Sequence, residues 1–453
     1  MSKRPNVLFL MSDEHRPDFA GYAGDKIVRT PVLDRIASDG VVFTNAYTPS
    51  PVCIPARQAM MAGQFPRHCG CEVYGQDLTP GYMTFSRVFS QHAYNTVVCG
   101  KLHHVGVDQM QGWTRRIGGD LHVDTPYIEG RVESEFQRYR EANLPPHRLN
   151  GKEGFKWTDA KEIQRAGVGH GCRHTEDDYA IKGALDFIDE YFNDIYYDKT
   201  GSDRPLFLKV SLTKPHYPYF AKEDKFRYYL NRVKPFADQL PPDHPYLSYK
   251  TVVPGQDVTE RDIRRAVAAY YAMIEELDDE FGRVLAALEE AGQNLDEWII
   301  IYTSDHGEML GEHSVWEKFK FYEGSAGVPL VIRYPKVSGG QRIVTDNVNL
   351  CDLFATLCDL AELPCPDGLD SRSMVQLMQG DNSHWDNETV SQFAGKHLMI
   401  KRDALKYQYY GDDMPEVLFD LERDPAENEN VIDDPRYESA LRDFRARKKE
   451  LGF

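Results

Sequence analysis

The most apolar strand-like run in the chain is Trp298-Ile299-Ile300-Ile301-Tyr302-Thr303, and Ser304-Asp305-His306-Gly307 follows it directly. An uninterrupted apolar run predicts a strand that is buried on both faces, as in the middle of a parallel sheet covered by helices. Open α/β sheets bind their ligands just beyond the carboxyl ends of such strands. Asp305 and His306 offer an oxygen and a nitrogen ligand for a metal ion there. A helix-capping Asp beside a turn histidine is the alternative for this pair alone.

Two other strand-like runs also end in polar side chains. Residues 7–11 (VLFLM) lead to Asp13, and residues 95–99 (NTVVC) lead to Lys101 and His103. Side chains two positions apart on an extended segment point to the same side, so Lys101 and His103 are expected to face one site. A turn Asp and a solvated edge segment are the ordinary alternatives for these motifs taken singly.

A histidine follows the strand-like run at residues 206–212 (LFLKVSL). His216 lies between Pro215 and Pro218, and proline on both sides stiffens a loop. A histidine held on a rigid loop beyond a strand suits a general acid. The alternative is a histidine that packs within an aromatic loop.

A nucleophile-type residue lies in Cys53-Ile54-Pro55-Ala56-Arg57. Pro55 suits the first turn of a helix, and Gly63 suits the residue just past its end. Cys53 would then sit at a helix N-terminus, which favours an anion, with Arg57 one turn later on the same face. A buried Cys beside a helix start is the alternative for this motif alone.

These motifs together resemble the type I, formylglycine-dependent sulfatases of the alkaline phosphatase superfamily. The matching pieces, in matching order, are Cys53-x-Pro55-x-Arg57, Lys101-x-His103, Lys214-Pro215-His216, Asp305-His306-Gly307 and Lys318. His306 and the stretch at residues 106–113 (GVDQMQGW) resemble choline-sulfatase-like and phosphonate monoester hydrolase-like members.

The resemblance implies an α/β fold with a large mixed, mostly parallel sheet sandwiched by helices, as in alkaline phosphatase. We expect a catalytic domain over residues 1–380. A smaller C-terminal α+β domain is expected over residues 381–453, where the composition changes and short strand-like pieces precede a closing charged helix.

The resemblance also implies the site chemistry. Cys53 would be oxidised to formylglycine, whose hydrated aldehyde is the nucleophile. One divalent metal ion, calcium in preference to manganese, would be bound by Asp13, Cys53, Asp305 and His306. The implied catalytic set is Cys53, Arg57, Lys101, His103, His216 and Lys318. In it, Arg57, Lys101 and Lys318 hold the sulfate oxygens, His103 lies near the nucleophile and His216 faces the leaving group. Many sulfatases carry a second acidic ligand where this chain has Glu14, so a ligand role for Glu14 stays open.

The expected function is hydrolysis of aryl or alkyl sulfate monoesters through a covalent sulfo-enzyme intermediate on residue 53. Hydrolysis of phosphonate monoesters or phosphodiesters at the same site is the alternative, because these esters share a tetrahedral anionic group. A non-catalytic anion-binding or scaffold protein of this fold is the third interpretation. The expected partners are a formylglycine-generating enzyme during maturation and further copies of the chain in a homo-oligomer.

Composition limits the function classes. The chain has 453 residues and a net charge of −18, which argues against a nucleic-acid-coating protein and against binding an anionic membrane surface. An anionic substrate therefore needs a local basic pocket. Eight scattered Cys indicate reduced thiols, and the apolar run at residues 7–11 is too short for a signal peptide. We therefore expect a cytoplasmic protein that does not enter a membrane.

The remaining sequence is less informative. Residues 120–200 show weak periodicity and are interpreted as an insertion over the active-site mouth. In it His170, Cys172 and His174 are taken as part of a polar loop rather than a metal cluster. Residues 220–258 predict little regular structure, whereas Thr259 begins a long amphipathic helix that ends at Gly292.

Overall fold

The computed structural model describes residues 4–118, 160–193, 204–237, 239–248 and 251–453. An eight-stranded mixed sheet with mostly parallel pairs forms its centre. Its strands, in spatial order, are β11 (Arg342–Val344), β2 (Val41–Phe43), β10 (Leu330–Arg333), β9 (Trp298–Ser304), β1 (Asn6–Asp13), β7 (Leu206–Pro215), β4 (Asn95–Gly100) and β5 (Arg115–Ile117). The predicted α/β fold is confirmed.

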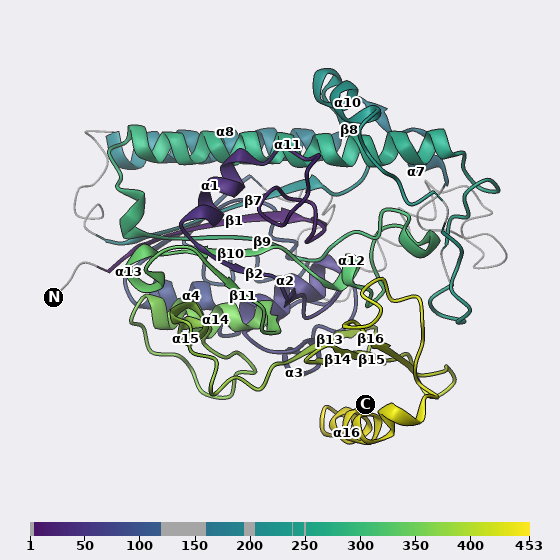
Figure 1. Cartoon of the computed structure of the whole chain (residues 1–453). Coiled ribbons are helices and arrows are strands. Elements are labelled where there is room, and N and C mark those ends of the chain that lie inside the picture. Colours follow the sequence, from purple (N-terminus) through teal and green to yellow (C-terminus); the bar gives the residue numbers. More distant parts are fainter. Residues whose placement is uncertain (1–3, 119–159, 194–203, 238, 249–250) are drawn as a thin grey trace.

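Helices cover both faces of this sheet (Figure 1). One face carries α1 (Pro31–Ser38), α8 (Cys172–Asn193) and α11 (Glu260–Glu290), and the other carries α2 (Cys53–Ala62), α4 (Phe85–Gln91), α14 (Leu353–Leu360) and α15 (Val375–Gln379). Shorter elements connect these layers: α3 (Pro66–Cys69), α7 (Ala160–Gln164), α10 (Glu223–Leu230), α12 (Glu323–Ala326), α13 (Pro335–Ser338), β3 (Ala46–Tyr47), β6 (Gly167–Val168), β8 (Phe220–Ala221) and β12 (Val348–Asn349).

The two central strands, β1 and β9, explain why the sheet is buried. Phe9 and Ile301 pack into the core on the α2 side, whereas Leu8 and Ile300 pack into the core on the α11 side. Successive strand residues point to opposite faces, so a strand apolar at every position fits only between two helical layers. The prediction that residues 298–303 form a central strand is confirmed.

The long helix α11 begins where the sequence predicted. Thr259 and Asp262 form a capping box, in which the Thr259 side chain accepts from the Asp262 backbone and the Asp262 side chain accepts from Thr259. None of the described helices combines the length and the apolar character that a bilayer crossing requires.

The C-terminal part contains a four-stranded antiparallel sheet of β13 (Glu388–Phe393), β14 (His397–Arg402), β15 (Leu405–Tyr409) and β16 (Val417–Asp420). Helix α16 (Glu438–Glu450) packs against it through Leu441 and Phe444. The expected domain boundary at residues 380 and 381 stays a prediction.

Two expectations about regular structure were wrong. Residues 172–193 form α8, so Cys172 and His174 lie in a helix and not in the expected polar loop. Helix α10 lies within residues 220–258, where little regular structure was expected. The chain turns at Thr44 and Asn45 between β2 and β3, which pair with different strands. Residues 120–159 and 194–200 of the expected insertion lie outside the described residues.

Candidate active site

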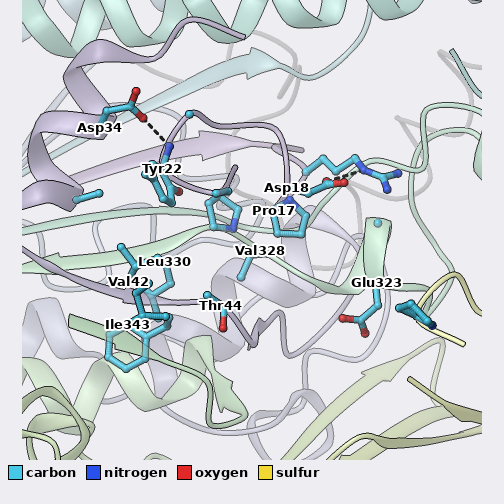
Figure 2. A pocket seen from close by; sticks show the side chains of 18 of the residues that line it. Pro17, Asp18, Tyr22, Asp34, Val42, Thr44, Glu323, Val328, Leu330 and Ile343 are labelled. Atoms are coloured by element: carbon cyan, nitrogen blue, oxygen red, sulfur yellow. Dashed lines mark hydrogen bonds and ion pairs between the residues drawn. The ribbon is translucent and has the colours of Figure 1, made fainter. Parts of the chain in front are cut away.

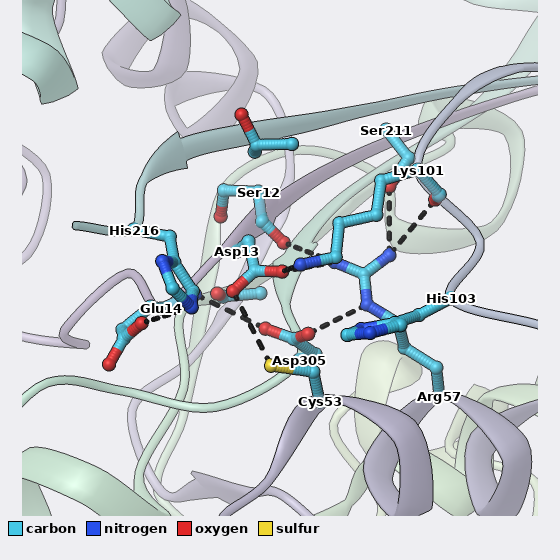
Figure 3. A network of polar contacts seen from close by, with 12 residues as sticks. Ser12, Asp13, Glu14, Cys53, Arg57, Lys101, His103, Ser211, His216 and Asp305 are labelled. Carbon is cyan, nitrogen blue, oxygen red and sulfur yellow. Dashed lines mark hydrogen bonds and ion pairs between the residues drawn. The ribbon is translucent and has the colours of Figure 1, made fainter. Parts of the chain in front are cut away.

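Side chains from four strand ends and one helix converge at the carboxyl edge of the sheet (Figure 3). Asp13 ends β1, Asp305 follows β9, Lys101 follows β4 and His216 follows β7. Cys53 is the first residue of α2. The structure therefore brings together the residues that the sequence placed at separate strand ends.

Cys53 lies at the centre of this group. Its Sγ is 3.1 Å from Nε2 of His306, 3.8 Å from Oδ1 of Asp13 and 3.5 Å from Nζ of Lys318. Gly63 ends α2 in the left-handed conformation, as predicted. Burial and the Asp13 carboxylate both raise the pKa of the Cys53 thiol, so the unmodified residue is not poised as a thiolate.

Four side chains could hold one metal ion. Ligand atoms of Asp13, Cys53, Asp305 and His306 all lie within 4.8 Å of one another, and all four residues are buried. His306 Nδ1 lies 3.0 Å from the carbonyl oxygen of Gly307 and donates to it, which leaves Nε2 to face the group. Two carboxylates and one imidazole, with an oxygen in place of the Cys53 sulfur, fit a divalent cation such as calcium or manganese.

Arg57 contacts the carboxylates of Asp13 and Asp305. It donates to Asp305 Oδ2 at 2.7 Å and to Asp13 Oδ2 at 3.3 Å, and its Nη1 donates to Ser211 Oγ at 3.0 Å. Lys101 forms an ion pair with Asp13. Burial would raise the pKa of Asp13, but Lys101, with further cations, holds it well below its usual value. These cations thus keep the Asp13 carboxylate ionised. The contact of Arg57 and Lys101 with sulfate oxygens stays a prediction.

His216 and Lys318 form a second part of the site. Lys318 Nζ lies 2.8 Å from His216 Nε2 and 2.8 Å from Glu14 Oε2. His216 Nδ1 donates to the carbonyl oxygen of Tyr217 at 2.6 Å, so Nε2 is the nitrogen that faces Lys318. Burial and Lys318 both lower the pKa of His216. Glu14 contacts Lys318 and His216 and lies outside the ligand group around Cys53. With Asp13 and His216 it forms a second buried group whose ligand atoms lie within 4.8 Å of one another, so its role as a metal ligand stays open.

His103 reaches the site by a different backbone route from the one expected. Its φ angle is 61°, so the segment is not extended and the alternation argument for Lys101 and His103 was wrong. Tyr74 lies beside it, with its hydroxyl 3.3 Å from His103 Nε2. Lys101 and His103 nevertheless both belong to the network of polar contacts drawn in Figure 3.

Sequence reasoning missed Ser211 and Tyr74. Ser211 lies within β7, four positions before its end, and alternation with Thr213 does not mark it, because Thr213 contacts Asp177 of α8. Tyr74 lies in a loop after α3, and no sequence pattern connects it with His103. His174 lies in α8 rather than in a loop, where its Nδ1 accepts from the backbone N–H of Gly171 at 3.2 Å.

A separate cavity of about 920 Å³ lies beside β2, β10 and α1 (Figure 2). None of the residues labelled in Figure 3 lines this cavity. Its carboxylates are already engaged: Asp18 and Glu312 pair with Arg16, and Asp34 accepts from the backbone of Tyr22. This cavity is therefore not assigned to the chemistry of Cys53.

The family model described as "Sulfatase" matches residues 5–363, which span both the sheet and the site. This chain belongs to the sulfatase family. A second model, the C-terminal part of N-sulphoglucosamine sulphohydrolase, matches residues 311–452 of this chain.

Curated relatives match this chain over nearly its whole length. A choline-sulfatase of Rhizobium meliloti is 29% identical, over 98% of this chain and 86% of the relative. Arylsulfatase K of Bos taurus is 30% identical, over 94% of this chain and 78% of the relative. Among solved structures, the phosphonate monoester hydrolase of Agrobacterium radiobacter matches with a TM-score of 0.76 and 24% identity, over 98% of this chain and 94% of that one, and shows the shared fold.

Proposed function

We propose that this sulfatase-family chain hydrolyses aryl or alkyl sulfate monoesters through a covalent sulfo-enzyme intermediate at residue 53, after Cys53 has been converted to formylglycine. The supporting observation is the position of Cys53 at the N-terminus of α2, in contact with His306 and Lys318 and beside Asp13. A helix N-terminus and a buried cation favour an anionic group at that place.

The ligand group would hold one divalent ion, with calcium favoured because two of its ligands are carboxylates. Such an ion lowers the pKa of an oxygen nucleophile and offsets the charge of an anionic ester. The protein's own cations add to this. Arg57, Lys101 and Lys318 are each at most 4% exposed and surround Asp13, so they form the local basic pocket that a chain of net charge −18 needs.

Two histidines would move protons. His216, with Lys318 at 2.8 Å, would give a proton to the leaving alcohol oxygen, because its Nε2 faces the pocket beside Cys53. Burial lowers the pKa of His216. The negative charge of a bound sulfate ester would oppose this effect and favour the protonated imidazole. His103 would then accept a proton in the second step, in which sulfate leaves and the aldehyde returns.

Replacement of His216 by alanine should slow the hydrolysis of esters with poor leaving groups most. An alkoxide needs a proton as it departs, whereas a nitrophenolate does not, so we expect about a 10²-fold or larger loss of kcat/KM for a phenyl or alkyl sulfate and a smaller loss for nitrophenyl sulfate. The measurement is kcat/KM for both esters. Equal losses on both would remove His216 from the general-acid role.

Comparison of an aryl sulfate with an aryl phosphonate monoester tests the substrate class. The site contains Lys101, Arg57 and Lys318 around one compact position, which favours the sulfate monoester. We expect the higher kcat/KM for the sulfate. A higher kcat/KM for the phosphonate monoester would establish the alternative activity instead.

A further inference from the structure

The candidate general acid lies on a loop rather than on a helix or strand. β7 ends at Pro215, His216 follows it, and the chain next enters regular structure at Phe220 in β8. Catalytic groups on loops are placed less accurately than groups on regular elements, and a displacement of about 1 Å can cost about 10²-fold in rate. An accurate position for His216 therefore needs support from outside the loop.

A buried carboxylate of α8 holds the chain immediately before His216. Asp177 is 1% exposed and accepts from the backbone N–H of Thr213 at 2.5 Å and from that of Lys214 at 3.1 Å. It also lies 2.9 Å from the Thr213 hydroxyl. Because the backbone N–H of His216 donates to the carbonyl oxygen of Thr213 at 3.0 Å, Asp177 reaches His216 through one residue.

A second buried carboxylate, from α11, contacts both ends of the loop. Glu276 is fully buried and accepts from the backbone N–H of Lys222 at 2.6 Å. Its Oε2 lies 3.5 Å from Nζ of Lys214, which is 2% exposed. One side chain therefore connects the residue two positions before His216 with a residue six positions after it.

Both carboxylates are costly to bury, and neither lies in the ligand group around Cys53. Burial raises the pKa of Asp177 to about 6, so it is ionised at neutral pH. Two helices thus each place a charged group against the same ten-residue segment, Thr213 to Lys222. A carboxylate that only capped a helix would have no reason to bind the backbone of this segment.

We propose that Asp177 and Glu276 are positioning residues that fix His216 for proton donation to the leaving group. They act through the backbone of Thr213 and Lys214 and through Lys222, without touching the reacting atoms. This inference rests on the proposed role of His216 as the general acid.

The test compares Asp177→Asn with a matched variant, Asp278→Asn. Asp278 is also fully buried, and its carboxylate accepts from the backbone N–H groups of Val32 at 3.0 Å and Leu33 at 2.8 Å, in α1. Each substitution therefore places an amide where a carboxylate accepted two backbone donors. Only Asp177 is connected to the His216 loop.

We expect Asp177→Asn to lower kcat/KM for phenyl sulfate by about tenfold or more, and for nitrophenyl sulfate by a clearly smaller factor, because only the first ester needs the proton. Asp278→Asn should lower the melting temperature and change kcat/KM for both esters by the same factor. Glu276→Gln should resemble Asp177→Asn. Thr213→Val removes the hydroxyl contacts with Asp177 and with the carbonyl oxygen of Arg173 but keeps both backbone donors to Asp177. It is a milder variant that serves if Asp177→Asn does not fold, with the same leaving-group pattern expected.

The outcomes separate this inference from the proposed function. If His216→Ala itself lowers kcat/KM equally for both esters, the general-acid role fails. A second outcome would contradict only the positioning role. In it, His216→Ala lowers kcat/KM mainly for the ester with the poor leaving group, whereas the folded variants Asp177→Asn, Glu276→Gln and Thr213→Val lower kcat/KM equally for both esters.

Discussion

Replacement of Cys53 by alanine should abolish sulfate-ester turnover, with a loss of about 10⁴-fold or more, because an alanine cannot become the nucleophile. The fold should persist. The substitution removes one buried sulfur atom at the start of α2, which should cost about 1 kcal/mol of the free energy of unfolding. The measurements are kcat for an aryl sulfate and the melting temperature, both on protein matured with a formylglycine-generating enzyme.

Cys358→Ala is the matched control. Cys358 is a fully buried thiol in α14, away from the ligand group, and its loss should leave turnover unchanged within about twofold. A Cys53→Ala protein that keeps a substantial fraction of the turnover would reject the nucleophile role of residue 53.

Removal of divalent metal should have the second-largest effect. We expect chelation to lower kcat/KM by about 10³-fold or more, and added calcium to restore it. Without the ion, only Arg57, Lys101 and Lys318 would offset the negative charge of the reacting ester. Binding has an independent readout. A ligand present at about 100 times its Kd stabilises the folded state by about 2.7 kcal/mol, so calcium should raise the melting temperature.

Asp305→Asn should lose that rise in melting temperature, since it removes one carboxylate of the ligand group, whereas Asp278→Asn should keep it. Manganese is the comparison ion, because one imidazole among the ligands admits it as well. A melting temperature that no divalent ion changes, together with full activity after chelation, would contradict the metal assignment.

The sequence predicted those parts of the fold that local patterns determine. Residues 298–307 combine a fully apolar strand with a polar end, and this order alone indicates a central strand with a ligand site at its tip. Cys53 was placed at a helix start because Pro55 and Gly63 mark the two ends of α2. Such signals lie within about ten residues of one another, which is why one sequence was sufficient to find them.

The parts that the sequence did not predict depend on contacts between distant residues. Arg57 donates to Ser211, which lies 154 positions away along the chain. Asp177 of α8 accepts from the backbone of Thr213 in β7. Helix α8 was missed because its many charged residues obscured a regular apolar face that includes Ala180, Ala184 and Phe187. The homo-oligomeric state and the cytoplasmic location stay predictions.

Mass spectrometry of the tryptic peptide at residues 36–57 tests the central claim most directly, because this peptide contains Cys53 as its single Cys. In active protein that was produced with a formylglycine-generating enzyme, we predict a mass about 18 Da below that of the Cys form. The modified fraction should rise in proportion to sulfate-ester turnover. Full turnover from protein in which residue 53 is an unmodified thiol would contradict the account.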